Sequence, residues 1–156
     1  MTFATGSRRN IAVLYTGGTI GMQAGDHGLR PSKESVLDAL AAYQQDIDWH
    51  VQVCEPLIDS SLVAPHHWMA WQQWIEAQQC DGILILHGTD TMAYTANVLA
   101  FALGDIVMPV VITKNTMTGN GGKAIKHQIA KIKPVVNCTA KPLSRILCGW
   151  APFFNR

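Results

Sequence analysis

Apolar runs and amphipathic segments alternate along the first two thirds of the chain. Four apolar, β-rich runs predict strands, at residues 10–15, 51–54, 82–86 and 109–113. Three segments between them carry apolar residues at helical spacing and predict helices, at residues 35–43, 65–79 and 91–103. This order predicts an α/β fold with a doubly wound, mostly parallel sheet. The run at 82–86 is apolar throughout, which indicates burial on both faces.

Two polar stretches follow directly on predicted strands. Thr-Gly-Gly-Thr at 16–19 follows the first strand, and His-Gly-Thr-Asp-Thr at 87–91 follows the third. Ligands of doubly wound sheets bind at the carboxyl ends of the strands, so both stretches are candidate site loops. The first stretch lacks the G-x-G-x-x-G pattern and the lysine of a phosphate loop, and a plain turn explains it equally well.

The stretch at 87–91 has two interpretations. Asp90 or Thr91 caps the helix that follows. Alternatively, the Asp90 carboxylate binds an ammonium group, while the N–H groups at the helix start favour negative charge. The Asp-Ser-Ser stretch at 59–61 is an ordinary polar loop when it is taken alone.

Length and composition indicate one globular domain. The chain has 156 residues, 48% of them apolar, which is enough for a core of its own. No apolar run approaches the roughly 18 residues of a membrane span, and the polar start lacks the apolar segment of a signal peptide, so we expect a cytoplasmic protein. The four cysteines form no C-x-x-C pair, and we interpret them as buried free thiols with neither a metal nor a disulfide.

Charge divides the chain sharply. Residues 1–113 hold four basic and eleven acidic residues, a net charge of −7, whereas residues 114–156 hold eight basic and no acidic residues. We interpret the second part as a separate tail. One hypothesis is a basic helix at 121–133 that binds nucleic acid or an anionic membrane. We favour the other hypothesis, a disordered or poorly packed tail.

Two motifs resemble the signatures of a known enzyme family. The octapeptide YTGGTIGM at 15–22 and the stretch LHGTDTMAYTA at 86–96 are similar to the two signatures of the bacterial asparaginases, most closely those of the cytoplasmic type I branch. Residues 59–61 lie between them, where that family has a substrate loop. The resemblance covers about residues 10–113. It implies the N-terminal α/β domain of an enzyme that hydrolyses L-asparagine to L-aspartate and ammonia, with no cofactor and no metal.

The resemblance assigns catalytic roles to three residues. Thr19 matches the nucleophile, which attacks the side-chain amide carbon and forms an acyl-enzyme that water then hydrolyses. Thr89 matches the second catalytic threonine, on the opposite side of the scissile amide. Asp90 matches the carboxylate that binds the substrate ammonium group and orients a lysine.

Four further residues match substrate-binding positions of the family. Ser60 matches the residue that binds the α-carboxylate, with Ser61 beside it. Gly18 and Gly88 would let the backbone approach the ligand. The family's oxyanion hole also draws on backbone N–H groups of these loops. Such a site suits a small zwitterion, which needs an anion site, a cation site and a polarised carbonyl between them.

Three features depart from the family pattern. A tyrosine of the family's mobile loop is matched here by Leu29, and its loss would slow proton transfer by about 10²-fold. The family's catalytic lysine and smaller C-terminal domain lie beyond residue 156. Nothing in residues 114–156 resembles the family. We therefore expect a truncated chain, with an asparaginase-like domain at 1–113 and an unrelated tail at 114–156 that is read out of frame, replaced or disordered.

The leading hypothesis is an amidohydrolase, an asparaginase with a threonine nucleophile, and the sequence leaves turnover by this chain open. Its partner is the small substrate L-asparagine. The full-length family forms homo-oligomers, and neither a membrane nor nucleic acid is expected as a partner. One alternative is a non-catalytic fragment that binds an amino acid without releasing ammonia. The other is a basic-tailed interaction protein, whose partner binding would require residues 114–156.

Overall fold

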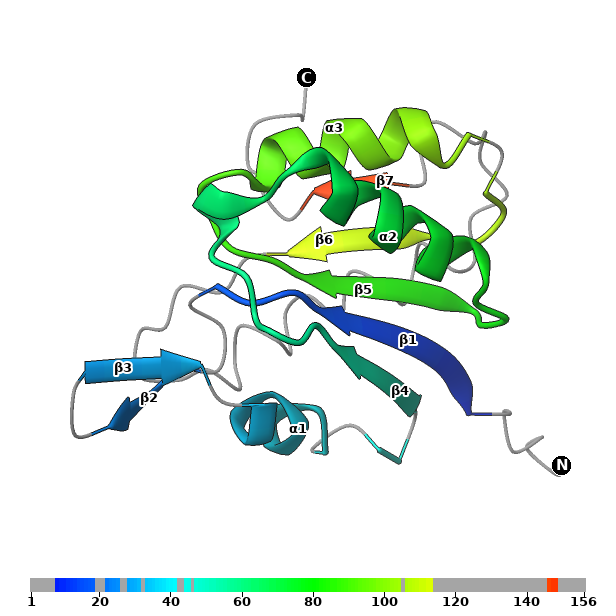
Figure 1. The fold of residues 1–156 in the computed structure, drawn as a ribbon. Coiled ribbons are helices and arrows are strands. Elements are labelled where there is room, and N and C mark those ends of the chain that lie inside the picture. Colours follow the sequence, from blue (N-terminus) through cyan, green and yellow to red (C-terminus); the bar gives the residue numbers. More distant parts are fainter. Residues whose placement is uncertain are drawn as a thin grey trace, which may run out of the picture.

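A five-stranded parallel sheet forms the centre of the structure, a computed structural model that describes residues 8–18, 22–25, 28–31, 33–41, 44–45, 47–104, 106–113 and 146–148. The strands are β1 (Arg9–Tyr15), β4 (Ile47–Val53), β5 (Gly82–Leu86), β6 (Val110–Thr113) and β7 (Ile146–Cys148). They lie in the order β4-β1-β5-β6-β7, and each pairs in parallel with its neighbour (Figure 1). The predicted α/β fold with a parallel sheet is confirmed.

Three helices cover the two faces of this sheet. They are α1 (Lys33–Ala41), α2 (Pro65–Glu76) and α3 (Met92–Ala102). α1 packs on one face, and α2 and α3 pack on the other (Figure 1). From β1 the chain moves outward to β4 and then returns to β5 on the other side of β1. The winding direction therefore reverses between β1 and β5, the place where doubly wound sheets bind ligands.

Alternate side chains of the strands build two core layers. Val13 of β1 packs in the layer that contains Leu40 of α1. Its neighbour Leu14 packs in the layer that contains Trp71 of α2 and Leu99 of α3. All five residues of β5 are buried, which confirms the prediction of burial on both faces. Two apolar layers, rather than one, thus hold β1 and β5 in place.

One predicted strand has the wrong start. The run at 51–54 corresponds to β4, which begins at Ile47, four residues earlier. β4 lies at an edge of the described sheet, and its exposed Asp48 and His50 alternate with Trp49 and Val51 on the other side. Because the edge strand is half-buried, its pattern has a period of two and forms no continuous apolar run.

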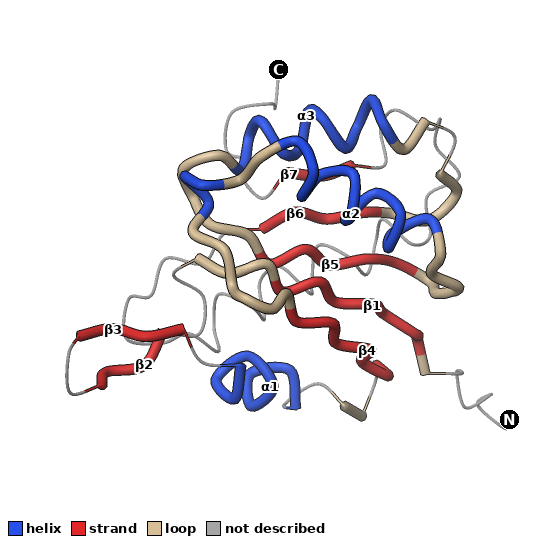
Figure 2. Tube along the Cα trace, viewed as in Figure 1, coloured by secondary structure: helices blue, strands red, loops and turns tan. Residues whose placement is uncertain are grey.

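Three strands were not predicted from the sequence. β2 (Met22–Gly25) and β3 (Gly28–Pro31) form an antiparallel hairpin that lies beyond the carboxyl ends of the sheet strands (Figure 2). β7 belongs to the basic tail and pairs with β6, Ile146 opposite Val110. The tail residues 114–145 and 149–156, with the helix expected at 121–133, lie outside the described residues.

The described part of the chain also bears on the expectations about the cysteines and about membrane spans. Cys54 and Cys80 are free thiols, but they are half-buried and not fully buried as expected. The helices have nine, twelve and eleven residues, and none of those described is long and apolar enough to cross a lipid bilayer.

The packing of α3 on the sheet predicts a large difference between two identical substitutions. Leu99 is fully buried between α3 and the sheet, whereas Leu62 is 71% exposed. Leu99→Ala should lower the free energy of unfolding by about 2–5 kcal/mol, because it leaves a cavity. Leu62→Ala should change it by less than about 0.5 kcal/mol. Urea unfolding of both variants measures the difference, and equal losses would contradict this account of the core.

Candidate active site

Three loops meet where β1 and β5 end. These two strands pair in register up to Tyr15 and Leu86, so residues 16–18 and 87–91 leave the sheet side by side. Residues 58–61, which lie between β4 and α2, complete the group. Segments far apart in the sequence thus meet at the carboxyl ends of the strands, at the reversal point of the sheet (Figure 1).

Thr16 ties these loops together. Its backbone N–H and its hydroxyl both donate to the carbonyl oxygen of Leu86, at 3.0 and 3.1 Å. Its own carbonyl oxygen accepts the N–H of Ile58 at 2.8 Å. Thr16 is only 2% exposed, so its hydroxyl stabilises the loops and does not face a substrate.

The loops approach one another so closely that three positions require glycine. At Gly17, whose φ is +127°, a Cβ would overlap the backbone of Ile58. Gly18 has a φ of +85°, and a Cβ there would lie 2.5 Å from the Cα of Gly88. A Cβ on Gly88 would in turn overlap the side chain of Ser60. Both glycines that were predicted to admit a ligand therefore lie at the contact between the three loops. A side chain at either position would push the loops apart.

Ser60 joins the loop at 58–61 to the loop at 87–91. It begins the short 3-10 helix η1 (Ser60–Leu62) and is 4% exposed. Its Oγ accepts the backbone N–H of Asp90 at 3.2 Å, and its carbonyl oxygen accepts the hydroxyl of Thr91 at 2.7 Å. Because the Oγ acts as the acceptor in the first bond, its own hydrogen is left for a further acceptor, such as a carboxylate.

Thr89 and Asp90 form the exposed tip of this group. The Thr89 hydroxyl donates to the Asp90 carboxylate at 2.9 Å. Thr91 occupies the N-cap position of α3 but makes no side-chain capping bond, because its hydroxyl donates to Ser60 instead. The capping interpretation is therefore wrong for Thr91, and the polar residues of this stretch contact one another and the neighbouring loop.

Ser61 is bound to Asp59 rather than to the other site residues. Its N–H and its hydroxyl both donate to one carboxylate oxygen of Asp59, each at 2.9 Å. These two bonds, the backbone bond first, hold the pKa of Asp59 below its usual value. Asp59 is therefore ionised at neutral pH. Of the two serines, only Ser60 has a described contact with Gly88 and Asp90.

Thr19, expected to be the nucleophile, lies outside the described residues, one position after Gly18. Leu29, which matches the family's loop tyrosine, lies in β3 opposite Ala24. Tyr15 does not replace that tyrosine. It is buried in the core layer of α1, and burial raises its pKa to about 12. Its phenol therefore stays protonated at neutral pH and cannot act as a base.

A buried polar network behind the loop at 87–91 was missed in the sequence. The Nδ1 of His87 lies 2.8 Å from the carbonyl oxygen of Gly88, and the Nε2 lies 3.1 Å from the hydroxyl of Thr95. The Thr95 hydroxyl also accepts the indole N–H of Trp68 at 2.9 Å. The ring of Trp71 meets the His87 ring edge-on, with centroids 5.6 Å apart. One signal was available in the sequence, a threonine on the apolar face of α3.

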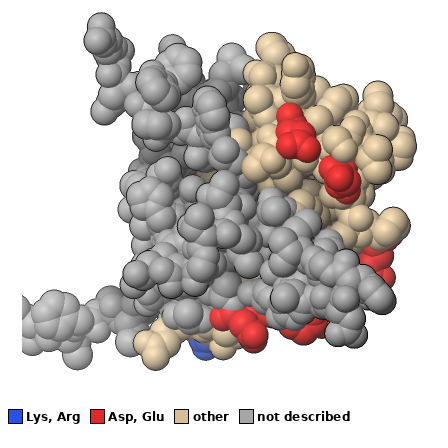
Figure 3. Space-filling model, turned by 90° about the vertical axis from the view of Figure 1, so that its left-hand side faces the viewer, with Lys and Arg blue, Asp and Glu red and all other residues tan. Residues whose placement is uncertain are grey.

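Acidic rather than basic side chains occupy the described part of the face that holds these loops. Figure 3 views the molecule from the side to which the carboxyl ends of the strands point. Asp and Glu atoms are visible at several places there, and Lys and Arg atoms of described residues only near the lower edge. Among the described residues, no three His, Cys, Asp or Glu side chains are grouped to hold a metal ion.

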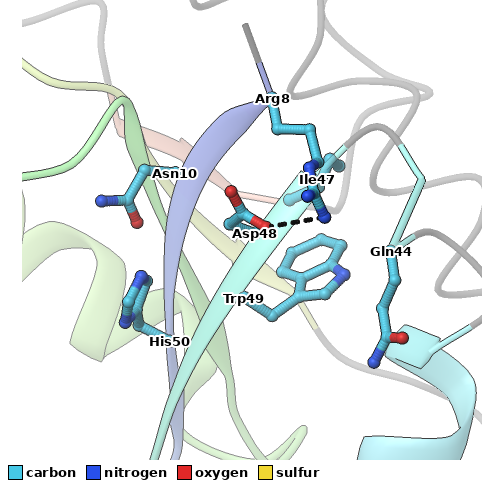
Figure 4. Close-up of a pocket in the computed structure, with 7 residues that line it drawn as sticks. All are labelled: Arg8, Asn10, Gln44, Ile47, Asp48, Trp49 and His50. Carbon is cyan, nitrogen blue, oxygen red and sulfur yellow. Dashed lines mark ion pairs between the residues drawn. The ribbon is translucent and has the colours of Figure 1, made fainter.

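A cavity of about 520 Å³ lies at the opposite, amino end of β1 and β4. Its lining includes Arg8 and Asp48, whose side chains form an ion pair of 3.3 Å and are each more than half exposed. Asn10 and His50 point to one side of the strands, and Trp49 points to the other (Figure 4). These residues surround the sheet edge and do not converge on one point. We interpret the cavity as a surface hollow, away from the site loops.

Comparisons with known proteins identify the family. The family model described as "Asparaginase, N-terminal" matches residues 10–118. The chain belongs to the asparaginase family. L-asparaginase 1 of Escherichia coli (strain K12) is 40% identical over 113 residues, which cover 68% of this chain and 33% of that protein. A 60 kDa lysophospholipase of Mus musculus is 35% identical over 140 residues, which cover 72% of this chain and 25% of that protein.

Solved asparaginase structures share the fold. L-asparaginase I of Vibrio cholerae is 30% identical, with a TM-score of 0.66, over 78% of this chain and 40% of that chain. The probable cytoplasmic L-asparaginase of Campylobacter jejuni is 26% identical, also with a TM-score of 0.66, over 90% of this chain and 44% of that chain. The resemblance to type I asparaginases is thus confirmed. The chain spans about a third of the length of the E. coli relative.

The glycine contact between the loops of this asparaginase-family chain can be tested by two matched substitutions. Gly18 and Gly104 both have positive φ, but an added Cβ at Gly104 meets nothing within 4 Å. Gly104→Ala should therefore cost only the backbone strain, about 1 kcal/mol of unfolding free energy. Gly18→Ala should cost about 1–3 kcal/mol more, because it also forces the loops apart. Equal losses in urea unfolding would show that the loops tolerate a side chain at Gly18.

Burial of His87 predicts that the asparaginase-family fold loses stability in mild acid. Burial lowers the pKa of His87 below its usual value, and burial also lowers the pKa of His67. As the pH falls, these two histidines are therefore protonated in the unfolded chain before they are protonated in the folded protein. The stability is fully present above the unfolded pKa of about 6.5 and falls as the pH drops towards the folded pKa. For the buried His87 the fall is up to about 1.4 kcal/mol per pH unit.

Urea unfolding between about pH 7.5 and pH 5.5 measures this dependence. The variant His87→Asn should show a smaller loss over that interval, because it removes one of the two titrating groups. If the variant shows the same pH dependence as the original chain, protonation of His87 does not lower the free energy of unfolding.

Proposed function

We propose that this chain supplies the substrate-binding loops for the hydrolysis of L-asparagine to L-aspartate and ammonia, with Thr19 as the nucleophile. The observation that carries the proposal is the meeting of Ser60, Asp90, Gly18 and Gly88 at the reversal point of the sheet. These groups come from the family's motifs, and they offer an acceptor for an ammonium group and a donor for a carboxylate.

The roles of the binding groups follow from their hydrogen bonds. The Ser60 Oγ accepts the Asp90 N–H, so its hydrogen can point to the substrate α-carboxylate. The exposed Asp90 carboxylate accepts the Thr89 hydroxyl and can also accept the substrate ammonium group, since a carboxylate has several lone pairs. With its two charged ends bound, the substrate would present its side-chain amide to the threonines. Ser61 supports this loop through Asp59.

The proposed reaction needs no cofactor. The Thr19 hydroxyl attacks the amide carbon, ammonia leaves, and water hydrolyses the acyl-enzyme. Backbone N–H groups of the glycine-containing loops would stabilise the developing oxyanion, and Thr89 would face the other side of the amide. The threonine hydroxyl requires a base.

Further features of the family are proposals for this chain as well. We propose a cytoplasmic protein that forms homo-oligomers, in line with the expectation from the sequence. We keep the division into an asparaginase-like domain at 1–113 and a distinct basic tail. The family match extends to residue 118, and β7 adds tail residues 146–148 to the sheet.

A second function, binding without turnover, has a specific observation in its favour. The groups proposed to bind the substrate's charged ends, Ser60 and Asp90, have direct hydrogen bonds among the described residues. The tyrosine that helps to activate the nucleophile in the family is replaced here by Leu29, which has no hydroxyl. The chain would then bind L-aspartate or L-asparagine and release no ammonia.

Calorimetry with L-aspartate and an ammonia assay with L-asparagine separate these functions. Ammonia release that is lost in Thr19→Val supports hydrolysis. Binding of aspartate without ammonia release supports the binding function. Absence of both would reject the site. In either positive case, Asp90→Asn should weaken aspartate binding by about 10–100-fold, because a charge-assisted hydrogen bond becomes a neutral one. Asp48→Asn, the same change at the opposite end of the sheet, should leave the affinity unchanged.

A further inference from the structure

The direction of every hydrogen bond in the buried network behind the loop at 87–91 can be assigned. The Trp68 indole can only donate, so the Thr95 oxygen accepts from it. A carbonyl oxygen can only accept, so the bond to Gly88 requires a hydrogen on Nδ1 of His87. A neutral imidazole with its hydrogen on Nδ1 accepts at Nε2, and the Thr95 hydroxyl donates there. The chain of bonds thus runs from Trp68 through Thr95 and His87 to the Gly88 carbonyl.

The environment of His87 favours this neutral form. The side chain is 1% exposed, and its surroundings include the edge-on ring of Trp71. Burial disfavours an imidazolium and lowers the pKa of His87. A second ring hydrogen, on Nε2, would also take away the acceptor of the Thr95 hydroxyl hydrogen.

The network acts on one peptide group of the site. In a trans peptide the C=O of one residue and the N–H of the next point in opposite directions, and the described non-proline peptide bonds are trans. Since the Gly88 carbonyl points to the His87 ring, the Thr89 N–H points away from it. The same Gly88 packs against Gly18 and Ser60 on the site side. Glycine alone would leave this peptide free to rotate, because it lacks a side chain.

We propose that His87 is a positioning residue that, together with Thr95 and Trp68, fixes the Gly88–Thr89 peptide so that the Thr89 N–H points at the substrate's side-chain carbonyl oxygen. This inference rests on the proposed function, because it assigns a direction to one donor of that site. His87 itself does not touch the substrate. The oxyanion that forms during hydrolysis would then meet a donor already oriented for it, which is the arrangement that stabilises such a charge.

Two substitutions at His87 separate positioning from simple filling of space. The amide nitrogen of asparagine can take the place of the ring Nδ1, so His87→Asn keeps a donor for the Gly88 carbonyl. The amide of glutamine reaches the place of Nε2, so His87→Gln keeps the bond to Thr95 and loses the bond to Gly88. Both variants remove the ring, and both should therefore lose similar stability. They should differ only in the orientation of the Gly88–Thr89 peptide.

Nitrogen-15 and carbon-13 NMR of the full chain tests the network without a ligand. At neutral pH the His87 ring should show its hydrogen on Nδ1, and a hydrogen on Nε2 would overturn the proposal. The amide signal of Thr89 and the carbonyl signal of Gly88 should stay near their original positions in His87→Asn and shift in His87→Gln. Equal shifts in the two variants would mean that the ring fills space and does not orient the peptide.

Affinity gives the second measurement. L-Aspartate should bind His87→Gln roughly tenfold more weakly than the original chain, the effect of about one misdirected hydrogen bond, and His87→Asn within about twofold. Equal weakening of both would contradict the proposal. If the original chain binds no aspartate, the proposed function fails, and the NMR comparison still decides whether His87 orients the peptide.

Discussion

The close contact between Gly18 and Gly88 is the constraint on which the rest of the site depends. β1 and β5 are adjacent parallel strands that end in register, so the two loops that follow them start about one strand spacing apart. Any side chain at the point of contact would separate them. Because both residues are glycine, the backbone of one loop can lie against that of the other. Ser60 then fits against Gly88 from the third loop.

The same polar bonds that hold the loops together also orient the groups that would meet a substrate. Thr16 donates both its hydroxyl and its N–H to the Leu86 carbonyl, which holds the start of the first loop beside the end of β5. The Asp90 N–H is bound by the Ser60 Oγ, so the proposed cation site and the proposed anion site share a hydrogen bond. A change in the position of one therefore moves the other. This coupling suits a ligand whose two charged groups have a fixed separation.

The sequence predicted most of the sheet because its strands are buried on both faces and form continuous apolar runs. It predicted β4 poorly because an exposed edge strand alternates, and Asp48 and His50 interrupt the run. The hairpin of β2 and β3 was missed because its short strands carry few apolar residues. The site loops were recognisable from their motifs, but their contacts were not. No sequence pattern indicates that Thr91 would donate to the Ser60 carbonyl, since the same residue in the same place is a good helix cap.

His87 and Thr95 illustrate why a second layer of a site is hard to predict. A histidine after a buried strand and a threonine on the apolar face of a helix are each ordinary when taken alone. Their meaning depends on which partners the fold brings within hydrogen-bond distance, eight and twenty-seven residues apart along the chain. Two buried polar side chains are unfavourable unless they pair. Once paired, their bonds have a fixed direction, because an indole at one end can only donate and a carbonyl at the other can only accept. The core of the protein thereby constrains the geometry of a glycine-containing loop at the edge of the site.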